Sequence, residues 1–121
     1  MYIPQDITIE AGAFDDCDNI TSVTVPRLYT TGFENCTSLQ TIYIHSATYF
    51  KDIPNYFPYA TTFYLPKTIE RLSVSESSTY NKTFYYEGTI DDWNKIQVDG
   101  TFGIGTIYVM SNGEYVLLEN A

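Results

Sequence analysis

Apolar and polar positions repeat in the same order in two stretches of the chain. Residues 14–25 and residues 33–44 both read apolar-x-x-Cys-x-x-apolar-x-x-apolar-x-apolar, with an offset of 19 residues. The spacing of three in the first part predicts one face of a short helix or a tight turn. The alternation at the end, as in Val23-Thr24-Val25, predicts a strand with two inward side chains and one outward side chain. Self-similarity at a fixed period predicts a stack of repeats.

The strand pattern continues along the chain with a slightly longer offset of 21 residues, as from Ile42 to Phe63 and then to Phe84. A turn followed by a strand, when repeated, stacks into a parallel sheet on one side of a right-handed coil. We therefore expect a single α/β solenoid domain over residues 1–121, with short helical or irregular return segments. Its rungs are expected near residues 1–4, 13–26, 32–45, 53–66, 83–87 and 106–110.

Four segments outside these rungs carry their own signals. Most of residues 73–82 is polar and serine-rich, which predicts a surface connection. Residues 89–96 read as a short helix that begins after a threonine N-cap. The glycines within residues 99–105 predict a flexible turn region. Residues 107–118 predict a β-hairpin on an Asn-Gly turn, and such a hairpin would cap the open end of the stack.

These patterns resemble the BspA-type leucine-rich repeat of bacterial surface proteins. The resemblance is carried by residues 13–26, by their second copy at residues 32–45, and by residues 84–96, which are similar to an end rung common in that family. It implies adhesion or recognition on microbial surfaces, or a structural part of a phage virion or surface fibre. It also implies no enzymatic activity and no cofactor. It names no ligand, because such repeats serve as general binding scaffolds.

The outward positions of the predicted strands form two rows. The middle residues of the triplets point away from the core and would stack from rung to rung at about 4.8 Å. One row is tyrosine-rich and the other, two residues earlier in each strand, carries hydroxyls. The candidate binding residues are Tyr43, Tyr64, Tyr85, Tyr108, Thr41, Thr62, Thr83 and His45, with Thr24, Ser22 and Thr106 completing the rows.

Two interpretations of these rows stay open. Tyrosine combines a large apolar area with a hydroxyl group and loses little entropy when it is held, which suits a protein or glycan partner. Tyrosine and threonine are also good strand residues whose neighbours pack laterally, so the rows could be purely structural.

Charge narrows the class of partner. Fifteen acidic residues against six basic ones give a net charge of -9, and this argues against nucleic acid or an anionic membrane. Residues 1–6 lack the features of a signal peptide, and no apolar stretch approaches the ~18 residues of a membrane span, so we expect no membrane insertion. We expect the chain to act at a cell surface or outside the cell as part of a larger protein, or alternatively in a virion.

Residues with catalytic or metal-binding chemistry are few. His45 is the single histidine, and a catalytic or ligand role would need partners that the chain barely offers. Cys17 and Cys36 occupy one repeat position, where buried thiols packed as small hydrophobes are favoured over a disulfide. The acidic turn at residues 15–19 does not fit a known calcium loop and favours a solvated helix start. We therefore predict no catalytic residue, no metal and no cofactor, and choose a recognition module over a structural part.

Overall fold

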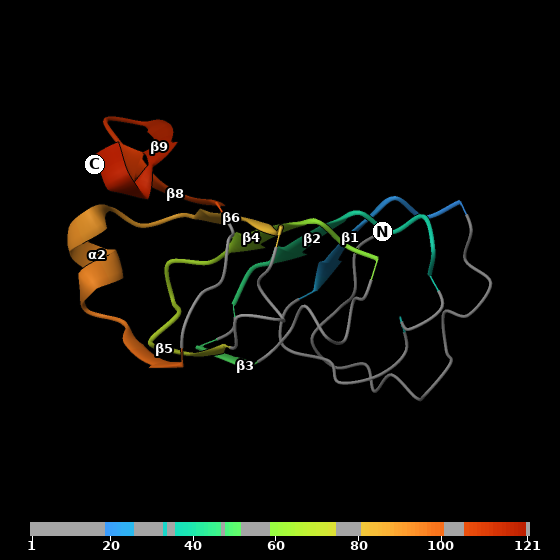
Figure 1. Cartoon of the computed structure of the whole chain (residues 1–121), viewed down its shortest axis with the longest axis horizontal. Helices are drawn as coiled ribbons and strands as arrows, with labels where there is room; N and C mark the ends of the chain where they lie inside the picture. Colours follow the sequence, from blue (N-terminus) through green and yellow to red (C-terminus); the bar gives the residue numbers. More distant parts are fainter. Residues whose placement is uncertain are drawn as a thin grey trace.

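Strands make up most of the regular structure in the described part of the chain (Figure 1). The computed structural model describes residues 19–25, 33, 36–46, 48–51, 59–74, 81–100 and 106–120. The larger sheet is mixed, because five parallel strands in it are followed by one antiparallel strand. It is not closed, since its first and last described strands do not pair with each other. In spatial order its strands are β1 (Ser22–Val25), β2 (Thr41–Ile44), β4 (Thr62–Leu65), β6 (Thr83–Tyr86), β8 (Thr106–Ser111) and β9 (Glu114–Leu117).

The register of this sheet is the one that the repeat predicts. Val23 pairs with Ile42, and the next two strands continue this row with Phe63 and Phe84. All four side chains are buried, because alternate residues of a strand point to the same face and this face meets the core. The rings of Phe63 and Phe84 stack with their centroids 5.5 Å apart. The predicted register of the parallel strands is thus confirmed.

A second, smaller sheet was not predicted. Its three parallel strands are β3 (Tyr49–Lys51), β5 (Arg71–Val74) and β7 (Gln97–Gly100). Figure 1 shows β3 and β5 in a layer apart from the larger sheet, and the chain visits the two sheets in alternation from β2 to β8. The return segments are therefore partly strands, and the molecule is more strand-rich than an α/β class suggests.

One sequence prediction is wrong at this second sheet, because Asp99 and Gly100 were expected in a turn region but end β7. Ser73 and Val74 end β5, so this strand includes the first two residues of the segment that was expected to be mostly a surface connection. The strands are only three or four residues long, so their alternation is too short to separate them from turns. Residues 75–80 and 101–105 lie outside the described residues, as do Cys17, residues 1–4 and most of the acidic turn.

The core is built from the inward residues of the larger sheet and from the segments that return between strands. Phe33, Cys36 and Leu39 are buried, and backbone bonds link Cys36 to Phe33 and Leu39 to Cys36. These bonds span three residues, which is the tight turn that the spacing predicts. Cys36 is a buried thiol. Leu72 of β5 belongs to the same cluster, so both sheets contribute to one apolar core.

The last third of the described chain contains α2 (Ile90–Asn94) and the β8–β9 hairpin, followed by the 3-10 turn η2 (Leu118–Asn120). Both predicted elements are present. Asn112 and Gly113 have positive φ values of 53° and 83°, as a two-residue hairpin turn requires. None of the described helices is long and apolar enough to span a membrane.

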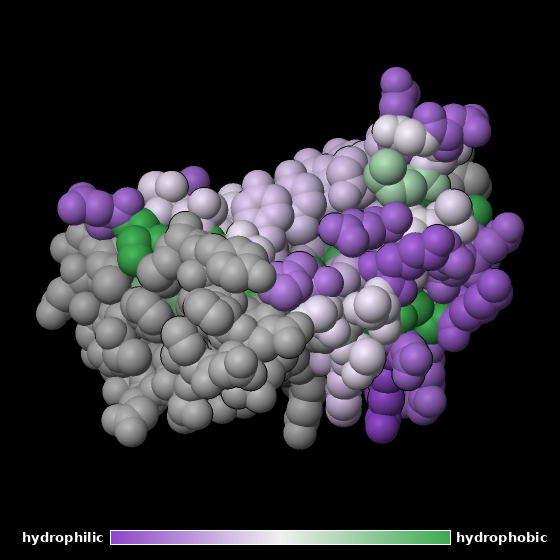
Figure 2. Space-filling view, turned by 180° about the vertical axis from the view of Figure 1, so that it is seen from behind, coloured by the Kyte–Doolittle hydropathy of each residue, from purple (hydrophilic) through white to green (hydrophobic). Residues whose placement is uncertain are grey.

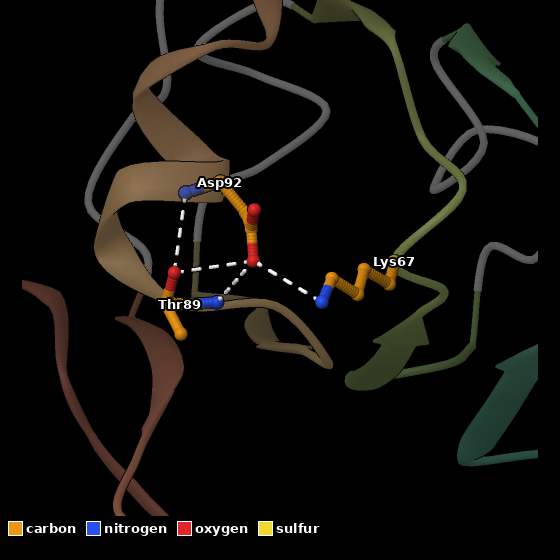
Figure 3. A network of polar contacts seen from close by, with 3 residues as sticks. All are labelled: Lys67, Thr89 and Asp92. Carbon is orange, nitrogen blue, oxygen red and sulfur yellow. Dashed lines mark hydrogen bonds and ion pairs between the residues drawn. The ribbon is translucent and has the colours of Figure 1, made fainter.

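A capping box begins α2 (Figure 3). The Thr89 hydroxyl oxygen accepts a bond from the Asp92 backbone N–H at 3.3 Å, and Asp92 Oδ2 accepts one from the Thr89 N–H at 3.1 Å. The pKa of Asp92 is lowered, chiefly by that bond from the Thr89 backbone. Lys67 approaches the same carboxylate at 3.6 Å from the turn after β4. Each of the two capping hydrogen bonds satisfies a backbone N–H group that has no hydrogen-bond partner within the helix.

Candidate binding face

Four tyrosines form a continuous stack on the outer face of the larger sheet. Tyr43, Tyr64, Tyr85 and Tyr108 are direct register partners on β2, β4, β6 and β8. Successive ring centroids are 4.5, 4.7 and 4.8 Å apart, and the ring planes differ by 15°, 11° and 9°. The stack follows from the register, because neighbouring strands lie about 4.8 Å apart, which suits offset ring stacking. We call these four residues the tyrosine ladder.

Stacking decides which part of each tyrosine meets solvent. Each inner ring has a neighbour on both faces, so the ladder presents ring edges and hydroxyl groups outward. Tyr43 at the end of the ladder is 40% exposed, whereas the other three rings are half-buried. The pKa of Tyr64 is raised, first by burial and then by the neighbouring Tyr43 and Tyr85 hydroxyls. The ladder is thus a narrow amphipathic ridge.

The β8–β9 hairpin adds a fifth tyrosine that the sequence analysis missed. The ring of Tyr115 meets Tyr64 and Tyr85 edge-on, with centroids 6.4 and 5.0 Å away. Burial is the first cause of the raised pKa of Tyr115, and Glu87 is the second. The alternation within β9 in the sequence indicates which residues share one face of that strand. The contact of the Tyr115 ring with the ladder depends in addition on how the hairpin bends over the sheet, which the alternation does not show.

The predicted hydroxyl row is also in register. Thr41 pairs with Thr62, Thr62 with Thr83, and Thr83 with Thr106. These side chains are half-buried, and threonine is shorter than tyrosine, so the row is recessed beside the ladder. Structure and sequence therefore agree on a hydroxyl-lined strip next to an aromatic ridge.

His45 follows the end of β2 and is half-buried. Its backbone N–H donates to the Val25 carbonyl at 3.1 Å, which continues the pairing between β1 and β2 by one residue. The sequence grouped His45 with the binding residues. In the structure it stands at the end of the strand rather than in the register of the four tyrosines.

Figure 2 shows a belt of intermediate hydropathy along the upper margin of the molecule, where Figure 1 places the larger sheet, with hydrophilic groups at both ends. Near the hairpin an open hollow of about 470 Å³ is lined by Tyr108 together with Thr106, Ile107, Leu117, Leu118 and Glu119. The described residues contain no cluster of three or more His, Cys, Asp or Glu side chains that could hold a metal ion. What the described geometry offers is an extended contact surface.

No protein-family model, curated protein or solved structure matches this chain. The interpretation of the face therefore rests on its geometry.

Proposed function

We propose that the chain is a leucine-rich-repeat solenoid of the BspA type that acts as a non-catalytic binding module. The alternation of the chain between two sheets supports the solenoid, since each return to the larger sheet adds one parallel strand beside the last. The 21-residue offset in the sequence lies within the length range of one leucine-rich repeat, and the 19-residue offset is slightly shorter than that range. A right-handed coil is the hand that parallel connections of this kind favour. The setting that we propose is a microbial surface or the outside of the cell.

The observation that carries the binding function is the stacked and partly exposed tyrosine ladder. A solvent-facing row of aromatic rings lowers the solubility of a protein. The strand propensity of tyrosine alone does not require a tyrosine at the same outward position of four neighbouring strands. Rings held on both sides by neighbours also lose little further entropy when a partner covers them. A rigid row of this kind is therefore prepared for contact with a large partner.

The ladder favours a protein partner over a glycan. Sugars bind aromatic side chains by lying on ring faces, and the faces of Tyr64 and Tyr85 are covered by their neighbours. Ring edges and hydroxyls suit the mixed apolar and hydrogen-bonding surface of a protein, where tyrosine is a frequent contributor of binding energy.

The alternative is a structural part of a virion or surface fibre, in which the same face contacts sister subunits. Identical chains bring identical charges together, and a net charge of -9 opposes that association in solution. We therefore place recognition of another protein first.

A binding screen with matched variants tests the proposal. The chain is screened against displayed protein fragments and a glycan array, beside the double variant Tyr64→Thr/Tyr85→Thr. Threonine is chosen because Thr24 holds the same register position on β1. Tyr59→Ala, at an exposed tyrosine outside the ladder, is the control. We expect protein fragments that bind the parent chain and the control but bind the double variant at least about tenfold more weakly.

Three results would overturn the proposal: no bound fragment, binding that the double variant retains, or binding to glycans alone. Sedimentation of the same proteins addresses the alternative. A dimer of the parent chain that the double variant abolishes would favour the structural part over recognition. Circular dichroism and urea unfolding establish that each variant is folded before its binding is compared.

A further inference from the structure

The two ends of the tyrosine ladder differ. At the β8 end the register partner of Tyr108 on β9 is Leu117, a side chain that continues the apolar surface. At the β2 end the register partner of Tyr43 is Thr24, which is much shorter than a tyrosine ring. Among the described strands, the stack therefore stops one strand before the sheet does, and a step remains over β1.

Within the described residues, the Tyr43 ring has its aromatic neighbour on the Tyr64 side, and its β1-facing side is next to Thr24. Tyr43 is 40% exposed, more than any other residue of the ladder. One of its faces is covered by Tyr64 at 4.5 Å, so the exposed area lies at its edge and on the side of Thr24. Among the described residues of the ladder, Tyr43 is therefore the more exposed end of the stack, where a planar group could add face to face.

We propose that this step binds an arginine side chain of the protein partner, with the guanidinium stacked on the open face of Tyr43. This inference rests on the proposed recognition function and deepens it by naming the partner's group. A guanidinium is planar, weakly hydrated and able to stack on an aromatic face while donating hydrogen bonds from its rim. The hydroxyl of Thr24, at the floor of the step, is an acceptor of the kind that such a group needs.

Charge and an internal example favour arginine over a neutral aromatic side chain. The net charge of -9 attracts a cation and gives no such preference to a phenyl ring. The fold itself already makes this contact elsewhere, since the guanidinium carbon of Arg71 lies 5.0 Å from the centroid of the Tyr49 ring. There the guanidinium also donates to Asp99 Oδ2 at 2.7 Å, so one arginine stacks and makes a hydrogen bond at the same time.

NMR titration with N-acetyl-arginine amide tests the site directly. The probe should shift the backbone signals of Thr24 and Tyr43 in a saturable way in the millimolar range. The lysine analogue should bind about threefold more weakly, because its ammonium is more strongly hydrated and cannot stack. The neutral, planar citrulline analogue and the phenylalanine analogue separate charge from stacking, and either of them binding as tightly as arginine would overturn the proposal.

Two variants at one position complete the test. Thr24→Leu fills the step with a non-planar side chain, as Leu117 does at the other end of the ladder, and should remove the saturable shifts, whereas Thr24→Ser keeps the step open and should preserve them. Shifts that persist in Thr24→Leu, or their absence in the parent chain, would contradict the arginine site. A protein fragment that binds Thr24→Leu as tightly as the parent but fails with Tyr64→Thr/Tyr85→Thr would reject the arginine site and leave the recognition function standing.

Discussion

At the scale of single residues, Gly88 and Tyr86 depend on each other. A Cβ added at Gly88 would lie 2.5 to 2.8 Å from three atoms at the far end of the Tyr86 ring. This ring is 1% exposed and meets Trp93 edge-on with centroids 5.5 Å apart, so a shift of the ring would disturb a packed contact. Gly113 is a glycine for a different reason, because it has open space around it but a φ of +83°.

We expect Gly88→Ala to destabilise the fold by about 1–3 kcal/mol, the usual cost of forcing extra volume into a packed site. Urea unfolding should show a lower midpoint with an unchanged slope, since compactness is not altered. Gly113→Ala serves as the comparison, because its cost comes from backbone conformation without a clash. A midpoint for Gly88→Ala that equals that of the parent chain would show that the Tyr86 ring moves aside.

At the scale of elements, the sequence predicts some strands well and others poorly. The register from Val23 to Phe84 could be predicted because each strand repeats one buried pattern at a nearly constant offset. The second sheet could not, because the described side chains of a strand such as β5 place buried Leu72 between exposed Arg71 and half-buried Ser73, which is too little alternation to read. The position of Tyr115 depends on how the hairpin curls, and no local pattern encodes that curl.

Thr89 predicts the start of α2, and the capping box that it forms with Asp92 allows the stability of this one helix to be tested. Thr89→Ala should cost about 1 kcal/mol, as the loss of an N-cap side chain usually does. The pKa of Asp92 is lowered in the fold from an ordinary value of 3.8, so its contribution to stability is present above that pH and is lost as the pH falls through the folded value.

Unfolding curves of Thr89→Ala and Asp92→Asn, measured near neutral pH and again in increasingly acidic buffer, check this prediction. The difference between Asp92→Asn and the parent chain should shrink in acid, because both then carry a neutral side chain. Lys67→Ala is the control for the ion pair at 3.6 Å, which is exposed on the lysine side and should contribute little. A difference that is the same at neutral and acidic pH would contradict the role of the ionised carboxylate.

At the scale of the whole molecule, the acidic charge and the packed tyrosines act together at high pH. The pKa values of Tyr64, Tyr86 and Tyr115 are all raised above the ordinary 10.0, with burial as the first cause in each. The fold therefore favours the neutral phenols. This contribution to stability is complete below the unfolded pKa of about 10 and is lost as the pH rises through the folded values.

We expect the chain to unfold more easily above pH 10, and part of its tyrosinate absorbance to develop at higher pH in the native protein than in urea. Ionised rings only 4.5 to 4.8 Å apart would repel each other and add to a net charge of -9, so the ladder should be a focus of the alkaline transition. Tyr64→Phe removes one late-titrating phenol and should reduce the late part of the absorbance change. Coincident titration curves in the native and urea-unfolded states would mean that the tyrosines are not held as the stacked ladder requires.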